Sequence, residues 1–179
     1  MFAPEDIELR SALSTAYFNS ENYDEALNHA LCVIELDEKD PQAYCNLGSC
    51  YSAQNMVDEA VESFKKASEI DPDYSLPHTN LGSLYATIGR IEKAIKEFKL
   101  ATSMNQSDSL AWMNLYSCYK EVGRMEDAQE AFRKYESLMN QGSQAEEQTN
   151  IPGGVSQTGQ LASGENMDTA SPGMEELTS

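Results

Sequence analysis

The sequence predicts an all-α solenoid of four helix–turn–helix units, because three kinds of residue recur along it every 34 positions. A leucine, a tyrosine and an alanine column keep this spacing with no insertion. A period of this length is typical of units that are too small to bury an apolar face alone and stack on their neighbours. The columns are Leu13, Leu47, Leu81 and Leu115; Tyr17, Tyr51, Tyr85 and Tyr119; and Ala26, Ala60, Ala94 and Ala128.

The period divides the repeat domain, residues 1–142, into units at 7–40, 41–74, 75–108 and 109–142. Each unit is predicted to form two amphipathic helices. In the third, Leu81, Leu84, Tyr85 and Ile88 share one helical face, and a second apolar face follows over residues 91–101. Residues that tolerate a left-handed backbone indicate the turns between the helices of a unit. These are Asn22, Asn55, Gly89 and Gly123.

The composition changes after residue 142. Residues 143–179 contain no lysine, arginine or aromatic residue, and they include six acidic residues. Such a segment cannot bury enough apolar surface to offset the entropy lost on ordering. We therefore predict a disordered, acidic tail rich in glycine and serine, long enough for residues 174–177 to reach back to the repeats.

Charge and cysteine usage limit the classes of function. The chain has 30 acidic and 12 basic residues and a net charge of -18, which disfavours binding to nucleic acid or to an anionic membrane. No apolar run is long enough to span a bilayer, and the first residues do not resemble a secretory signal. The four cysteines form no Cys-x-x-Cys pair, so we expect reduced thiols in a cytoplasmic protein.

The residues at the repeated positions resemble the tetratricopeptide repeat, whose signature is Trp-x2-Leu-Gly-x2-Tyr, then Ala-x3-Phe, then Pro. The second unit matches most fully, and the first is the most degenerate, with Ser14 and Ala30 in place of the glycine and the phenylalanine. The matching residues beyond the three columns are Tyr44, Gly48, Phe64 and Pro72; Gly82 and Phe98; and Trp112 and Phe132.

The resemblance covers residues 7–142. It implies a right-handed superhelix whose first helices line a concave groove that binds a peptide segment of another protein. Here the first helices carry unusually little charge, since residues 41–54 and 75–88 contain no charged residue. The expected groove floor is therefore neutral and polar. The units at 7–40 and 41–74 are acidic overall, so we expect a partner segment that is neutral or basic.

One polar column on this floor suits a peptide backbone. Asn46, Asn80 and Asn114 occupy the same position in three units, and each amide offers a donor and an acceptor. Similar asparagine columns occur in the repeat domain of the O-linked N-acetylglucosamine transferase. The alternative is that these asparagines only satisfy hydrogen bonds of helix packing. A second column, three residues on, comprises Ser49, Ser83 and Ser117, with Thr15 in the first unit.

Hydrogen bonds to the asparagines do not suffice for binding. Three bonds at about 0.5–1.5 kcal/mol each fall short of the roughly 8 kcal/mol that micromolar affinity requires. Apolar groove contacts must supply the rest. The candidates are Leu76, Leu110 and Met113.

Co-chaperones of this family hold a terminal carboxylate with a clamp of lysine and arginine. Here the equivalent positions contain no basic residue, and only the asparagine at Asn46 matches the clamp. We therefore expect a groove without a carboxylate clamp. The positions are Ser11, Thr15, Asn46, Leu76 and Asn80.

The sequence does not indicate an enzyme, because it contains no nucleophile motif, phosphate-binding loop or metal-ligand spacing. Cys45 and His78 at neighbouring groove positions are too few for a metal site, and we expect no cofactor. The predicted function is a scaffold or adaptor that binds a peptide segment of a partner protein. Two alternatives stay open: self-association through an uncapped last unit, since Gly142 leads into the tail, and a dedicated chaperone or targeting subunit.

Overall fold

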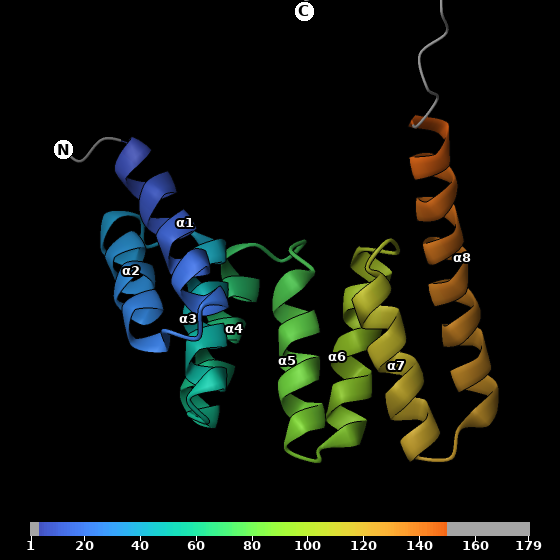
Figure 1. The fold of residues 1–179 in the computed structure, drawn as a ribbon. Coiled ribbons are helices and arrows are strands. Elements are labelled where there is room, and N and C mark those ends of the chain that lie inside the picture. Colours follow the sequence, from blue (N-terminus) through green and yellow to red (C-terminus); the bar gives the residue numbers. More distant parts are fainter. Residues whose placement is uncertain (1–3, 150–179) are drawn as a thin grey trace, which may run out of the picture.

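The computed structural model describes residues 4–149, with the surroundings of side chains given for residues 6–141. This part of the chain forms a solenoid of helices paired one after another (Figure 1). No helix in it has the length and apolar character needed to cross a membrane. The helices are α1 (Pro4–Asn19), α2 (Tyr23–Leu36), α3 (Pro41–Ala53), α4 (Val57–Ile70), α5 (Leu76–Thr87), α6 (Ile91–Met104), α7 (Ser109–Glu121) and α8 (Met125–Thr149).

The first helices of successive pairs form an inner layer. α3 contacts both α1 and α5, and α5 also contacts α7, whereas no two of the second helices α2, α4, α6 and α8 contact each other within the described residues. Closer spacing on one side than on the other is what a curved solenoid requires. The inner, concave face is therefore lined by α1, α3, α5 and α7, as the family resemblance implies.

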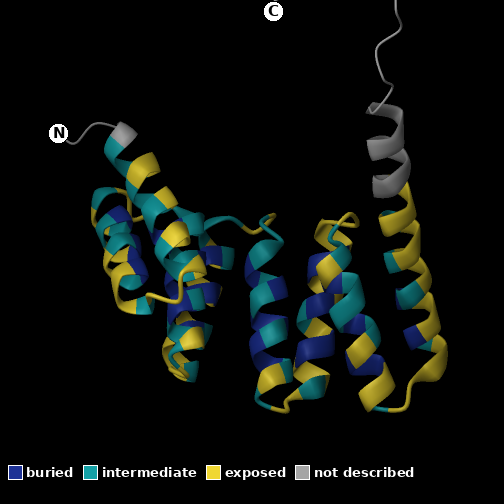
Figure 2. Ribbon diagram, viewed as in Figure 1, coloured by how far each residue is buried: buried dark blue, intermediate teal, exposed yellow. Residues whose placement is uncertain are grey.

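Most residues of the repeated columns lie in the core. All four alanines are buried, as are the last three leucines and the last two tyrosines, whereas Leu13, Tyr17 and Tyr51 are half-buried. Figure 2 shows buried segments on the helices from α2 to α8 where they face their neighbours. Gly48 and Gly82 lie directly against the rings of Phe64 and Phe98, so a side chain at either glycine would collide with the ring.

The turn within the first unit differs from the sequence prediction. The residue with positive φ is Glu21 at 61°, followed in the later units by Asn55 at 60°, Gly89 and Gly123. Asn22 was therefore the wrong choice: it lies one residue later and is the N-cap of α2. The residue with positive φ keeps the 34-residue spacing, although asparagine tolerates a left-handed backbone better than glutamate does.

The C-terminal end also departs from the expected boundary. α8 continues through Gly142 to Thr149, so the segment expected to be a tail begins inside this helix. Several residues after Gly142 are good helix formers, which explains how a segment without aromatic residues extends a helix. Residues 150–179 lie outside the described part, and the disorder expected there stays a prediction.

The last unit replaces two small residues by tyrosines. Tyr116 stands where Gly48 and Gly82 stand in earlier units, and Tyr135 stands where Ala67 and Ala101 stand. Phe132 lies between them, with its ring centroid 5.0 Å from that of Tyr116 and 6.1 Å from that of Tyr135. These three rings pack together at the C-terminal end of the solenoid, where the second and third units have small residues at two of the three positions.

Candidate functional site

The predicted groove contains a hollow between the inner helices of the first three units. Its volume is about 220 Å³, and it brings Ser49, Asn80 and Ser83 together. Phe18 of α1, Phe64 of α4 and Leu84 of α5 supply apolar walls. Side chains that sequence analysis placed in two separate columns thus meet in one concave site. The remaining lining residues are Ser52, Ala53 and Thr87.

The three asparagines are all half-buried but differ in their hydrogen bonding. Asn46 Oδ1 accepts a bond of 2.9 Å from Gln42 Nε2, so this amide is already engaged within α3. No hydrogen bond within the described residues involves the side-chain amides of Asn80 and Asn114. Asn80 therefore presents both a donor and an acceptor to the hollow, whereas Asn46 retains mainly its amide hydrogens for another partner.

The serine hydroxyls point their hydrogens back to their own helices. Ser49 donates to the carbonyl of Cys45 at 2.9 Å, Ser83 to that of Thr79 at 3.0 Å, and Ser117 to that of Met113 at 3.1 Å. Thr15 donates in the same way to Ser11. A hydroxyl whose hydrogen is used can still accept. These side chains can therefore accept N–H groups of a bound segment, but they are poorly placed to donate.

The apolar candidates are spread along the inner face. Leu76 packs partly against the core, Met113 is half-buried and Leu110 is 59% exposed. None of the three lines the hollow that contains Asn80, and neither does Asn114. The structure does not gather the nine predicted residues into one site: of these, the hollow brings together Ser49, Asn80 and Ser83.

Phe18 is the lining residue that sequence analysis missed. It belongs to none of the repeated columns, and the equivalent position in the second unit is Ser52. A large aromatic residue at a position that is small or polar in the other units is the signal that could have identified it.

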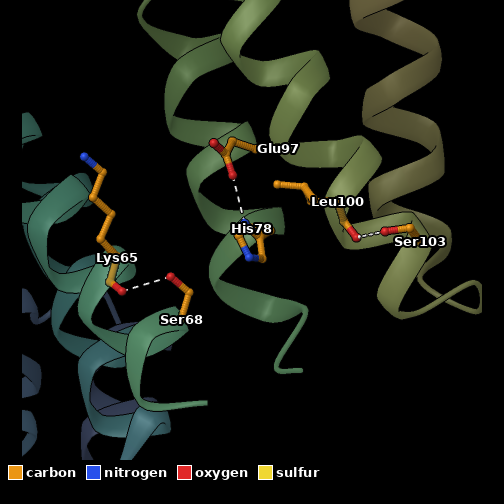
Figure 3. Close-up of polar contacts among 6 residues, drawn as sticks. All are labelled: Lys65, Ser68, His78, Glu97, Leu100 and Ser103. Atoms are coloured by element: carbon orange, nitrogen blue, oxygen red, sulfur yellow. Dashed lines mark hydrogen bonds and ion pairs between the residues drawn. The ribbon is translucent and has the colours of Figure 1, made fainter. Parts of the chain in front are cut away.

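Cys45 and His78 occupy neighbouring positions of the predicted groove, but each contacts a different partner. Cys45 is buried against Tyr74, and burial raises the pKa of its thiol to about 12. His78 Nδ1 lies 2.8 Å from Glu97 Oε2, and Figure 3 shows this pair facing each other between α5 and α6. The described part of the chain contains no cluster of three or more His, Cys, Asp or Glu side chains suited to a metal.

Two hydrogen bonds between units involve residues close to the start of α5 and α7. Thr79 Oγ1 donates a bond of 2.8 Å to Asp108, and Tyr74 donates from its hydroxyl to Gln42. Asp108 also accepts from the backbone N–H of Ala111 at the start of α7. These bonds fix one inner helix against the next and so set the shape of the groove.

The comparison with family models identifies the repeats. Two models described as the tetratricopeptide repeat match residues 41–74, which is the second unit, and residues 63–96, which overlap the second and third units. Residues 41–96 therefore belong to the tetratricopeptide-repeat family. Proteins with these repeats are, in general, interaction modules, and the fold supports a protein–protein interaction scaffold. No curated protein sequence matches the chain at a significant level.

Solved structures with similar folds are distant in sequence. A crystal structure of MamA has 20% identity and a TM-score of 0.68, covering 79% of this chain and 82% of that one. PilF of Pseudomonas aeruginosa has 20% identity and a TM-score of 0.70, covering 75% and 61%. The tetratricopeptide-repeat domain of Arabidopsis OM64 has 19% identity and a TM-score of 0.61, covering 65% and 97%. At these identities the similarity concerns the fold alone.

Proposed function

We propose that the tetratricopeptide repeats bind an extended peptide segment of another protein in the concave groove, with Asn80 as the central contact. The observation that carries this proposal is the unengaged amide of Asn80 beside Ser49 and Ser83 in one hollow. An extended backbone alternates C=O and N–H groups, which matches an amide flanked by two hydroxyl acceptors.

The asparagines would contribute unequally. Asn80 and Asn114 can each donate to a carbonyl and accept from an N–H of the ligand, whereas Asn46 first has to release or share its bond with Gln42. Each new bond contributes about 0.5–1.5 kcal/mol. We therefore expect Asn80 and Asn114 to matter more for affinity than Asn46.

Apolar contact in the hollow supplies further affinity. Phe18, Phe64 and Leu84 offer a small apolar surface that suits one aliphatic side chain of the ligand. Burying such a side chain contributes about 1.5–3 kcal/mol. Leu76, Leu110 and Met113 extend the apolar surface toward the C-terminal units.

The expected partner segment is neutral or basic. A second hollow of about 530 Å³ at the N-terminal end of the groove includes the carboxylates of Glu8 and Asp40 together with Thr15. Basic side chains of the ligand would be favoured there, and the middle of the groove contains no charge. In this proposal the chain has no catalytic role and uses no cofactor, and its location is cytoplasmic.

Selection of peptides and asparagine substitution would test the proposal. Random 12-residue peptides displayed on phage are selected against the full chain, and their dissociation constants are measured for the wild type and for Asn80→Ala/Asn114→Ala. We expect a loss of about tenfold or more, because two bonds of roughly 1 kcal/mol each disappear. Asn140→Ala, an exposed asparagine of α8, is the matched control and should bind as the wild type does. Unchanged affinity of the double variant, with an intact helical spectrum, would refute the role of the asparagines.

Self-association through α8 is a second candidate. Within the described residues α8 contacts only α7, and Met139 on its surface is 48% exposed. Such an apolar face at the end of a solenoid invites contact with another copy. Tyr135 argues against a copy that simply continues the repeats, because the equivalent residues of α4 and α6, second helices that precede another unit, are the small Ala67 and Ala101. Sedimentation of the full chain as a monomer at tens of micromolar would exclude this candidate.

A further inference from the structure

The outer face of the last two units contains two adjoining hollows that the concave groove does not involve. One, of about 400 Å³, has Trp112, Leu115 and Tyr119 of α7 at its floor. The other, of about 510 Å³, has Ile95 and Leu100 of α6. Lys99 and Ser103 line both, so the two hollows form one continuous surface along α6. We call this surface the α6 trough.

The equivalent place one unit earlier is closed. There His78 replaces Trp112, and its ring pairs with Glu97 of α6, leaving the two side chains 14% and 17% exposed. Figure 3 shows this pair with Lys65 and Ser68 of α4 on one side and Leu100 of α6 on the other. The α6 trough lacks such a pair, since Ala131 stands where Glu97 stands in the preceding unit. Its apolar floor is therefore open to a ligand.

Basic side chains outnumber carboxylates at one end of the α6 trough, around Leu100, in a strongly acidic chain. Lys96, Lys99 and Arg124 surround the hollow over Leu100, where the one carboxylate is Glu92. Arg124 is paired with Asp127 at 2.7 Å, but Lys96 and Lys99 form no ion pair within the described residues. The neighbouring hollow adds Lys134 and the carboxylates of Asp127 and Glu130. An acidic segment with two apolar side chains would complement this combination.

We propose that the α6 trough binds residues 174–177 of the same chain, Met-Glu-Glu-Leu. Met174 and Leu177 would cover the apolar floors, and Glu175 and Glu176 would pair with Lys96 and Lys99. No other stretch of residues 150–179 combines two adjacent carboxylates with flanking Met and Leu. This contact lies on the outer face and does not depend on the proposed function of the groove.

The reach of the chain permits this contact. The 24 residues between α8 and Met174 span about 27 Å on average if they behave as a flexible chain. The distance back along α8 from Thr149 to Lys134 is about 22 Å at 1.5 Å per residue. A short tether of this kind gives an effective concentration near 1 mM. A dissociation constant of about 0.1 mM would then suffice for about 90% occupancy.

Trp112 provides a direct readout, because it is the only tryptophan in the chain and lines the trough. The indole N–H cross-peak of the ¹⁵N-labelled full chain is recorded for the wild type and for Glu175→Lys/Glu176→Lys at physiological salt. We expect this double substitution to shift the cross-peak. Glu165→Lys/Asp168→Lys makes the same change of charge outside the proposed segment and should leave the cross-peak in place.

Repeating the tail substitution in variants that lack selected lysines tests whether the segment binds at Lys96 and Lys99. In Lys96→Ala/Lys99→Ala the tail substitution should no longer shift the cross-peak, whereas in Lys65→Ala/Lys66→Ala, on α4, the shift should persist. An unchanged cross-peak on tail substitution in the wild-type background would overturn the proposal. So would a shift that disappears on dilution from 200 to 5 µM, since the segment of a second copy would then be the occupant.

Discussion

A β-carbon at Gly48 would lie 2.7 Å from the ring atoms Cδ1 and Cε1 of Phe64, and the same relationship joins Gly82 to Phe98. The ring is almost fully buried, so it cannot swing aside. Where the glycine is absent, the partner differs as well: the first unit has Ser14 with Ala30, and in the last unit the rings of Tyr116 and Phe132 are tilted against each other with centroids 5.0 Å apart. The residue at the glycine position and the residue at the phenylalanine position of a repeat therefore pack as a pair.

Gly48→Ala should destabilise the protein. Overpacking costs about 1–3 kcal/mol, which exceeds the gain of about 1 kcal/mol from replacing glycine by alanine in a helix. We expect a net loss of roughly 1 kcal/mol in the free energy of unfolding, measured in urea. With Phe64→Leu in the background the substitution should be neutral or favourable. An equal loss in both backgrounds would show that the ring is not the cause.

Replacing Glu21 by glycine should stabilise the protein. Glu21 has a φ of 61°, where a residue with a β-carbon is strained and glycine is not. Glu21→Gly should therefore raise the free energy of unfolding by about 0.5–1 kcal/mol. Asn55→Gly is the control: asparagine tolerates this backbone, and its replacement should change stability less. Equal gains at both turns would contradict the assignment of strain to Glu21.

Asp108 should matter more than Asp40, although both cap inner helices. Asp40 accepts from Gln42 and Ala43 in its own helix, whereas Asp108 also holds the buried hydroxyl of Thr79 in the preceding unit. Loss of the cap costs about 1 kcal/mol, and an unsatisfied buried hydroxyl adds about 1–3 kcal/mol. Asp108→Ala should thus be the more destabilising in thermal unfolding. Addition of Thr79→Val should recover part of the difference.

Alkaline pH should weaken the fold through its buried thiols. Burial raises the pKa of Cys50 to about 11, whereas the unfolded thiol ionises near its ordinary value of 9.0. The raised pKa means that its contribution is complete below pH 9 and is lost as the pH rises toward 11. Between pH 8 and 10 the wild type should lose about 1 kcal/mol that Cys50→Ala does not lose. Parallel profiles of the two proteins would contradict this.

The repeat spacing was sufficient to predict the helices, their pairing and most of the core, because each unit contributes the same residues at the same positions. The prediction was wrong at individual positions. The conformational preference of asparagine favours Asn22, but the residue with positive φ is Glu21, which keeps the 34-residue spacing of the later turns. Composition alone also placed the end of the last helix too early, since Gly142 does not end α8.

The repeat spacing predicted which polar residues share a column, but it did not predict how their side chains are arranged in the candidate site. The spacing placed Asn80, Ser49 and Ser83 on inner helices, and the structure brings them into one hollow. It could not reveal that Gln42 occupies the amide of Asn46, or that Phe18 closes the hollow, because both depend on side chains outside the repeated pattern. The open α6 trough was equally hidden, since it arises from one unit lacking the pair that fills its neighbour.

Mapping a bound peptide on the full chain would test the central claim most directly. A ¹⁵N-labelled sample is titrated with the tightest phage-selected peptide, and the perturbed backbone amides are assigned. Binding in the concave groove predicts that the largest shifts lie on α1, α3 and α5, centred on Asn80 and extending to α7. Shifts confined to α2, α4, α6 and α8, with the amides around Asn80 unmoved, would contradict it.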